Sequence, residues 1–160
     1  MATIYISIGS NINPAENIQL ALDDLNNAFG EIVCSSHYES KAVGFEGDNF
    51  INLVVRAKTG LDISAVADRL HEIEDRHGRD RSGPKFSSRT LDLDLLLYDD
   101  EIFEQGKLKI PRDEILFNAF VLRPLAELAP DLKHPLEHKS YAELWSTFDK
   151  ESQPLWPIKH

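Results

Sequence analysis

Two aspartates separated by one residue are the part of this sequence best suited to chemistry. They lie in the segment Arg-Thr-Leu-Asp-Leu-Asp-Leu-Leu-Leu at residues 89–97, and its alternation predicts a strand over residues 90–98. Because side chains alternate across a strand, Asp92 and Asp94 share one face while the leucines between them face a core. Two residues of strand place their Cα atoms about 7 Å apart, so both carboxylates can share a cluster of divalent cations. The alternative is a strand with a solvated acidic face.

A basic segment comes directly before these aspartates. Residues 76–90 contain five cations and a single acid, Asp80; the cations are Arg76, Arg79, Arg81, Lys85 and Arg89. This local charge of +4 leaves −14 on the rest of a chain whose net charge is −10. Carboxylates beside cations fit a bridging metal–polyphosphate complex, in which the carboxylates hold Mg²⁺ and Arg and Lys neutralise phosphate. The alternative is a solvated basic loop.

Two glycine patterns bear on how phosphate would be held. The sequence contains no Gly-x-x-x-x-Gly-Lys-[Ser/Thr] motif, so a P-loop is excluded. The segment Gly9-Ser10-Asn11 is predicted to be a tight turn after the first strand, and its backbone has room to approach a ligand. An ordinary turn is the simpler interpretation of these three residues.

Length, composition and charge limit the class of protein. The chain has 160 residues, 42% hydrophobic and 28% charged, which indicates a single globular domain over residues 1–160. One cysteine and the absence of a signal sequence or an apolar stretch of about 18 residues predict a cytoplasmic protein. A net charge of −10 argues against nucleic acid or an anionic membrane as partner. We expect a monomer that binds small molecules.

The elements that would position these residues follow the order β-α-β-β-α-β. Hydrophobic periodicity and turn residues predict strands at about 4–8, 31–43, 50–57 and 90–98 and helices at about 14–29 and 62–77. A small hairpin is expected within 101–110, and further helices near 118–128 and 140–148. This order predicts an α+β fold, a ferredoxin-like antiparallel sheet with extra C-terminal helices and a hairpin.

Other residues with chemical potential are better explained by structure. Cys34 lies in a predicted strand and is expected to be a buried apolar residue. His134 and His138 have helical spacing, but a proline between them and the lack of a third ligand argue against zinc. Trp145 is expected in the core, and the apolar segment 155–158 is expected to dock as a tail.

Five segments, in order along the chain, resemble those of 6-hydroxymethyl-7,8-dihydropterin pyrophosphokinases. They are Tyr-Ile-Ser-Ile-Gly-Ser-Asn (5–11), Phe-Ile-Asn (50–52), His-Gly-Arg-Asp-Arg (77–81), Arg-Thr-Leu-Asp-Leu-Asp (89–94) and Asn-Ala-Phe-Val-Leu (118–122). The resemblance covers residues 4 to about 135. It implies an ATP-dependent diphosphotransferase of folate biosynthesis, which moves the terminal diphosphate of ATP to a pterin alcohol and releases AMP.

The resemblance also implies roles for particular residues. Asp92 and Asp94 would bind two Mg²⁺ ions, and Arg79 and Arg81 would act in catalysis from a loop that closes over ATP, the co-substrate. Further ATP contacts would come from His71, Glu74, Lys85, Arg89, Lys107, Lys109 and Arg112. The pterin would be bound by Ser40, Val43, Phe50, Asn52, Phe86 and Phe120, with Phe120 as one of the aromatic rings that stack on it.

Two positions depart from the pattern of this family. Arg112 stands where well-known members have a histidine that contacts phosphate, and Asn118 stands where an arginine is frequent. These departures leave open a paralogue that binds pterin or nucleotide but turns over weakly. A second alternative is a ferredoxin-like module that binds RNA or another ligand, which the net charge and the lack of an RNP-type aromatic pattern disfavour.

The composition of residues 78–88, with two glycines, three serines and one proline, predicts a loop that stays open until a polyanion arrives. Closure would bring Arg79 and Arg81 to phosphate and exclude water. Arg79→Ala and Arg81→Ala should therefore lower kcat more than they weaken ground-state ATP binding. Single-turnover kinetics and equilibrium nucleotide titration measure the two effects. A rise in KM alone for both variants would mean a static phosphate cradle instead.

Overall fold

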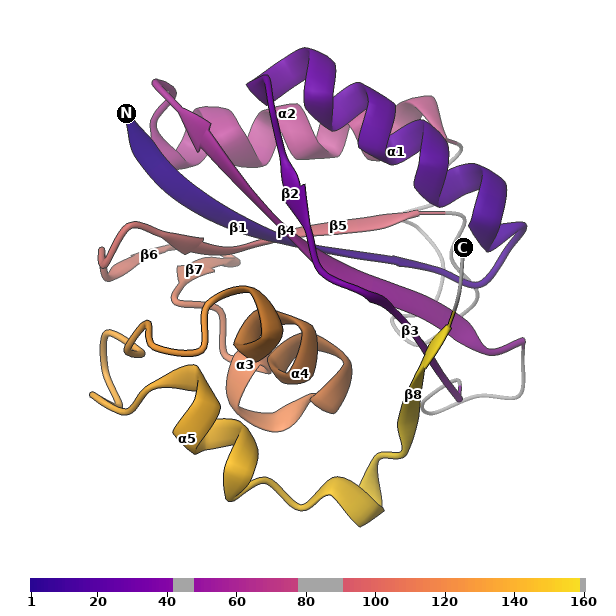
Figure 1. Cartoon of the computed structure of the whole chain (residues 1–160). Coiled ribbons are helices and arrows are strands. Elements are labelled where there is room, and N and C mark those ends of the chain that lie inside the picture. Colours follow the sequence, from indigo (N-terminus) through magenta and orange to yellow (C-terminus); the bar gives the residue numbers. More distant parts are fainter. Residues whose placement is uncertain (42–47, 78–90, 159–160) are drawn as a thin grey trace.

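An antiparallel sheet forms the centre of the molecule (Figure 1). The computed structural model describes residues 1–41, 48–77 and 91–158. In these residues the sheet has the strand order β5-β1-β4-β3-β8, and a short strand, β2, also pairs with β4. Its strands are β1 (Ala2–Ser10), β2 (Val33–Cys34), β3 (His37–Ser40), β4 (Phe50–Thr59), β5 (Asp92–Tyr98) and β8 (Leu155–Ile158). The sheet order β5-β1-β4-β3, with one long helix after β1 and one after β4, confirms the predicted ferredoxin-like arrangement.

Helices cover both faces of the sheet. Figure 1 shows two long helices, α1 (Pro14–Phe29) and α2 (Ile63–Arg76), on one face. The other face carries α3 (Glu114–Phe117), α4 (Ala119–Leu128) and α5 (Tyr141–Ser146). The remaining elements are the hairpin of β6 (Phe103–Gln105) and β7 (Leu108–Ile110) and a 3₁₀ turn, η1 (Lys150–Ser152). The predicted hairpin and the two predicted C-terminal helices are therefore confirmed.

Local signals explain where the two long helices begin and end. α1 starts with Pro14, which suits the first helical position, and ends at Gly30, whose φ of 78° is accessible to glycine. α2 begins after Asp62, and its carboxylate accepts a hydrogen bond from the Ala65 amide at 2.8 Å. Both helices turn a buried apolar stripe towards the sheet.

Alternation along the strands separates two cores. In β1, Ile4, Ile6 and Ile8 pack beneath α1 and α2, whereas Tyr5 belongs to the core formed with α4 and α5. Strand β5 follows the same rule up to Leu95, which lies in the first core. Asp92 and Asp94 therefore point to the α4 face of the sheet, as the two-residue period predicts.

A β-bulge interrupts this alternation near the end of β5. Tyr5 pairs with Leu97 and Ile6 with Leu95, so Leu96 is the extra residue on β5. Leu96 and Leu97 are both buried in the core beside α4. The predicted core face of Leu91, Leu93 and Leu95 is thus confirmed, and the alternation ends after Leu95 because the bulge turns one additional leucine to the second face.

The single long strand predicted over residues 31–43 is also wrong, since two short strands separated by Ser35 and Ser36 replace it. The Ser35 hydroxyl accepts a hydrogen bond from the Val54 amide at 3.0 Å, and the Ser35 amide donates to the Val54 carbonyl at 2.9 Å. The Ser35 hydroxyl thus takes the place of a backbone carbonyl as acceptor, and the regular hydrogen bonding to β4 is interrupted between β2 and β3. Residues 42 and 43 lie outside the described residues.

Of the two sequence predictions for segments β2 and β8, one is wrong and one is confirmed. Cys34 is exposed, not buried as expected, because β2 is only two residues long and lies at the margin of the sheet. The apolar tail does dock, and it does so as strand β8, antiparallel to β3. Among the described residues, no helix has the length and apolar character needed to cross a membrane.

Ser35→Ala tests the break between β2 and β3. The substitution removes the acceptor of the buried Val54 amide, so the free energy of unfolding should fall by about 1–3 kcal/mol. Denaturant unfolding measures this loss. Ser146→Ala is the matched control, because its hydroxyl donates to Glu143 on the exposed surface of α5, and it should change stability by less than about 0.5 kcal/mol. Equal stabilities of the two variants would contradict this account.

Candidate active site

A row of paired residues across three strands forms the base of the candidate site. Gly9 on β1 pairs with Asn52 on β4 and with Asp92 on β5. Directly paired residues project to the same face of a sheet, so Asn52 and Asp92 lie on the α4 face with Gly9 between them. Two strand spacings put their Cα atoms about 10 Å apart. The sheet thus holds an amide and a carboxylate on either side of a position without a side chain.

A side chain at Gly9 would displace the Asn52 amide from its present position. A Cβ atom on Gly9 would lie 2.7 Å from Asn52 Oδ1 and 3.9 Å from a ring carbon of Phe50. Gly9 also lies inside β1 and not in a turn, so the turn predicted at Gly9-Ser10-Asn11 is wrong by two residues. Its functional value is visible only from the register, because the pairing with Asn52 and Asp92 depends on three strands.

The amide at the β4 end of the row is held by β3. Asn52 Nδ2 donates to the Ser40 hydroxyl at 3.3 Å, and both side chains are buried. Phe50, two residues before Asn52, lies on the same face and is half-buried. The structure therefore brings together three of the residues that sequence assigned to pterin binding: Ser40, Phe50 and Asn52.

The acidic pair at the β5 end lies beside an arginine. Arg112 Nη2 lies 3.4 Å from Asp94 Oδ1 and 2.9 Å from Glu114 Oε1, which also accepts from Arg112 Nε at 3.1 Å. The Arg112 backbone amide donates to the Leu96 carbonyl at 3.0 Å, so β5 itself fixes this residue. One of the two departures from the family pattern thus supplies positive charge to the candidate metal ligand.

Among residues 1–41, 48–77 and 91–158, several carboxylates and one arginine influence Asp94. Removal from water raises the pKa of Asp94 well above the ordinary range of aspartate; Arg112 opposes this rise, while Asp92, Glu114 and Glu74 add to it. Burial lowers the pKa of Arg112, but the carboxylates of Asp94 and Glu114 outweigh that effect and raise it. In the part of the chain that the structure describes, one guanidinium lies among several carboxylates, an arrangement suited to a further cation.

The donor set fits Mg²⁺ better than a metal enclosed by protein. In residues 1–41, 48–77 and 91–158, no group of three or more His, Cys, Asp or Glu side chains is arranged to hold a metal ion. Asp92 and Asp94 offer a pair of carboxylates on one face of β5. Mg²⁺ typically takes one or two carboxylates and completes its shell with water and substrate phosphates. Two carboxylates that leave the rest of the coordination shell to water and phosphate match that preference.

Glu74 supports the acidic pair from outside the sheet. Its buried carboxylate accepts a hydrogen bond from the Leu93 amide at 2.8 Å, directly between Asp92 and Asp94. β5 is an edge strand of the sheet, so this contact satisfies a backbone donor that no neighbouring strand pairs. The family resemblance assigned Glu74 to ATP; its contact with β5 was not predicted, since no local pattern links residues 19 apart.

Phe120 lies in the first turn of α4, where it is half-buried against the core beside that helix. Asn118, directly before the helix, donates from Nδ2 to Glu114 Oε2 at 3.2 Å. Glu114 therefore contacts both Arg112 and Asn118, the two departures from the family pattern. A single carboxylate links them, which sequence alone does not reveal.

Three further residues that sequence assigned to ATP binding lie outside the three strands of the row Asn52–Gly9–Asp92, on the β6–β7 hairpin and on α2. Lys109 forms an ion pair with Asp113 at 3.0 Å, Lys107 is exposed in the β6–β7 turn, and His71 is exposed on α2. Six assigned residues lie outside the described residues: Val43, Arg79, Arg81, Lys85, Phe86 and Arg89.

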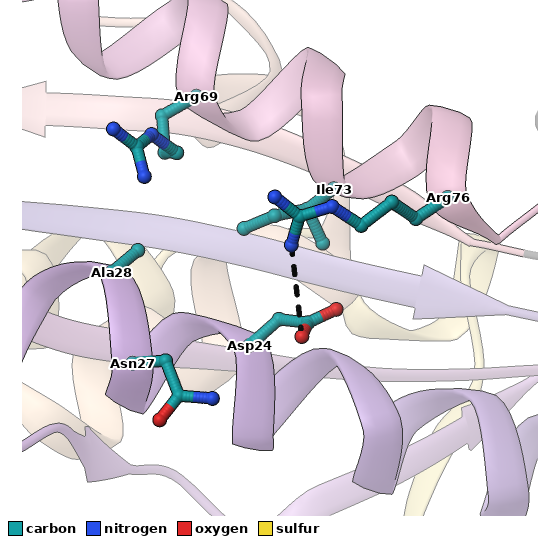
Figure 2. Close-up of a pocket in the computed structure, with 6 residues that line it drawn as sticks. All are labelled: Asp24, Asn27, Ala28, Arg69, Ile73 and Arg76. Atoms are coloured by element: carbon teal, nitrogen blue, oxygen red, sulfur yellow. Dashed lines mark ion pairs between the residues drawn. The ribbon is translucent and has the colours of Figure 1, made fainter.

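Two hollows on the surface lie away from this row. One, of about 130 Å³, lies between α1 and α2 and is lined by Asp24, Arg69 and Arg76 among others. Figure 2 shows Arg76 reaching across it to Asp24, at 3.8 Å. The other, of about 330 Å³, is lined by residues including Tyr5, Asp99 and Tyr141 at the opposite end of β5. Neither of these two hollows is lined by Asp92, Asp94 or Asn52.

The fold and the site agree with a transferase that handles a polyphosphate co-substrate, and the comparisons with known proteins establish this class. A family model described as 7,8-dihydro-6-hydroxymethylpterin-pyrophosphokinase (HPPK) matches residues 5–130. The chain belongs to this family. It is an ATP-dependent diphosphotransferase, a pyrophosphokinase of folate biosynthesis, and the resemblance drawn from the five motifs is confirmed.

Two curated relatives support this membership, each named 2-amino-4-hydroxy-6-hydroxymethyldihydropteridine pyrophosphokinase. The Synechocystis protein is 37% identical over 156 residues, which cover 96% of this chain and 78% of the relative. The Aquifex aeolicus protein is 36% identical over 145 residues, which cover 89% and 90%. Similarity therefore extends along most of this chain and more than three quarters of each relative.

Solved structures show the same fold. An HPPK-DHPS structure in complex with substrates matches with a TM-score of 0.76 at 12% identity, covering 94% of this chain and 44% of that one. Wild-type Plasmodium falciparum HPPK-DHPS matches with a TM-score of 0.75 at 14% identity, covering 94% and 46%. The chain spans less than half of these longer proteins, and at such low identity the likeness concerns the fold.

Glu74→Ala tests the support of β5. Loss of the carboxylate leaves the buried Leu93 amide without this acceptor, so the free energy of unfolding should fall by about 1.5–3 kcal/mol. Amide exchange at Leu93 should accelerate, and Glu74→Gln, which keeps an acceptor oxygen, should retain most of the protection. Glu72→Ala, on the exposed side of α2, is the control. Unchanged exchange at Leu93 in Glu74→Ala would refute the assignment.

Proposed function

We propose that this chain transfers the terminal diphosphate of ATP to the hydroxymethyl group of 6-hydroxymethyl-7,8-dihydropterin, giving AMP and the pterin diphosphate. The observation that carries the proposal is the row Asn52–Gly9–Asp92. A hydrogen-bonding amide for a heterocycle and a carboxylate for a metal–phosphate complex stand about 10 Å apart across the sheet. A planar pterin with its alcohol directed at phosphate fits between them.

The pterin subsite in this proposal lies over Gly9. Asn52, oriented by Ser40, would bind the polar edge of the ring, and the missing side chain at Gly9 lets the Asn52 amide lie over β1 in that orientation. Phe120 would stack on one face of the heterocycle. The remaining proposed pterin contacts are Val43, Phe50 and Phe86.

The phosphate subsite lies along β5. Asp92 and Asp94 would hold two Mg²⁺ ions, which when bound polarise phosphoryl oxygens and neutralise their charge. Arg112, already fixed beside Asp94, would place its guanidinium near the phosphates. The remaining proposed ATP contacts are His71, Glu74, Arg79, Arg81, Lys85, Arg89, Lys107 and Lys109.

Positioning accounts for the reaction without a nucleophilic side chain. The pterin hydroxyl oxygen forms a bond to the β-phosphorus of ATP, while the bond from that phosphorus to the oxygen bridging to the α-phosphorus breaks. The electron pair of the broken bond stays on AMP, and the hydroxyl proton is released. The protein's part is to align both substrates in line and to balance charge. We propose that it does so as a cytoplasmic monomer.

Asp92→Ala and Asp94→Ala test this proposal. Each removes a ligand oxygen for the metal, so pterin-dependent AMP release should fall at least about 100-fold in kcat/KM, or about 3 kcal/mol. The fold should persist, because removing one of two neighbouring like charges relieves repulsion. Circular dichroism and unfolding check the fold, and coupled AMP detection measures the rate.

The matched control is Asp100→Ala, an exposed aspartate in the turn that follows the same strand. It should keep the rate of the parent protein. If both Asp92→Ala and Asp94→Ala remain within tenfold of the parent, the metal assignment is wrong. If the parent protein releases no AMP in the presence of the pterin alcohol, ATP and Mg²⁺, the proposed reaction itself is wrong, and a binding paralogue is the remaining interpretation.

A further inference from the structure

A side chain from the C-terminal segment holds the backbone at the junction of α3 and α4. Gln153 Oε1 accepts a hydrogen bond from the Ala119 amide at 2.9 Å, and its Nε2 donates to the Phe117 carbonyl at 2.7 Å. One amide group thus spans Asn118 and satisfies a donor and an acceptor on either side of it. Phe120 follows directly.

Gln153 provides a hydrogen-bond acceptor at the start of α4, where the N-cap side chain provides none. The first four amides of a helix have no partner within the helix, and a side chain at the N-cap usually satisfies one of them. Asn118 is the N-cap of α4, yet its side chain makes no capping bond and instead donates to Glu114. The Ala119 amide is therefore held by a residue 34 positions away. The first turn of α4, which carries Phe120, depends on this distant contact.

The segment that carries Gln153 is itself anchored at both ends. Before it, Lys150 Nζ donates to the Trp145 carbonyl at 2.7 Å, which ties η1 to the end of α5. After it, β8 pairs with β3, with Leu155 opposite Ser40. Figure 1 shows this segment running from α5 past the start of α4 to the sheet edge. This segment thus connects two parts of the candidate site, the start of α4 and strand β3.

These two parts are the walls of the proposed pterin subsite. Ser40, which orients Asn52, lies on the strand that β8 pairs with, and Phe120 lies in the turn that Gln153 holds. The family model ends at residue 130, so this contact is outside the part of the chain that it matches. A small change in the first turn of α4 would tilt the aromatic ring relative to the amide across the subsite.

We infer that Gln153 is a positioning residue for pterin binding, which acts by fixing the backbone of residues 117–119 and thereby the orientation of the Phe120 ring. This inference rests on the proposed function, because it takes Phe120 as the pterin-stacking residue. Gln153 touches neither substrate in this account. Its effect should therefore appear in the affinity for pterin and not in the affinity for nucleotide.

The experiment compares Gln153→Ala, Gln153→Glu and Phe120→Ala with the parent protein. Titration calorimetry measures the Kd of 6-hydroxymethylpterin in the presence of a non-hydrolysable ATP analogue and Mg²⁺, and the Kd of the analogue alone. Gln153→Ala should weaken pterin binding about tenfold and leave nucleotide binding within twofold. Gln153→Glu keeps the acceptor for the Ala119 amide but loses the donor to Phe117, so its pterin affinity should be intermediate.

The double variant Gln153→Ala/Phe120→Ala separates positioning from general loosening. If Gln153 acts through the ring, its removal should have no further effect on pterin affinity once Phe120 is alanine. Ser152→Ala, a neighbouring exposed residue of η1 whose hydroxyl donates to Asp149, is the control and should bind pterin as the parent does.

Three results would overturn the inference. They are parent-like pterin affinity in Gln153→Ala, equal weakening of pterin and nucleotide binding, and additive losses in the double variant. Failure of the proposed function is distinguishable from all three: in that case the parent protein itself would not bind the pterin, and Phe120→Ala would make no difference. Parent binding that is sensitive to Phe120 but insensitive to Gln153 would refute this inference alone.

Discussion

The pairing of β1 with both β4 and β5 is the constraint on which the candidate site depends. Each strand contributes a side chain of little use by itself: an amide on β4 and two carboxylates on β5. Antiparallel registers bring Asn52 and Asp92 to the same face at a separation of two strand spacings. Gly9 lets the Asn52 amide lie against β1, since any Cβ at Gly9 would meet the Asn52 side chain. A slip of one residue in either register would turn one of these groups to the opposite core.

Charge balance is the second organising feature. Asp92, Asp94 and Glu114 lie on the α4 side of the sheet, Glu74 supports the edge of β5, and Arg112 forms ion pairs with Asp94 and Glu114. Burial makes this excess of carboxylate unfavourable in the free protein, as the raised pKa of Asp94 indicates. A site that is destabilised without its cationic and anionic ligands gains more from binding them. The same imbalance accounts for an arginine at position 112, because it offsets part of the repulsion.

Contacts at the two edges of the sheet hold the elements of the candidate site in place. Several of them are hydrogen bonds between a side chain and a backbone group. Glu74 closes the open edge of β5, and the C-terminal segment covers the opposite edge by pairing with β3. Gln153 then carries this support to the start of α4. Such contacts hold strand and helix ends at fixed positions without filling the space above the row, which has to admit two substrates.

The sequence by itself determined the elements whose signals are local. Period-two and helical periodicity, the proline at the start of α1, the Asp62 cap of α2 and the acidic pair on one face of a strand all depend on residues within a turn or a pleat of one another. The family motifs also predicted the reaction class. Tertiary structure alone decided the break at Ser35, the bulge at Leu96, the exposure of Cys34, and the partners of Gly9, Glu74, Arg112 and Gln153. Each of these depends on strand register or on contacts between residues about 18 or more positions apart, and local spacing carries no information about which distant groups will meet.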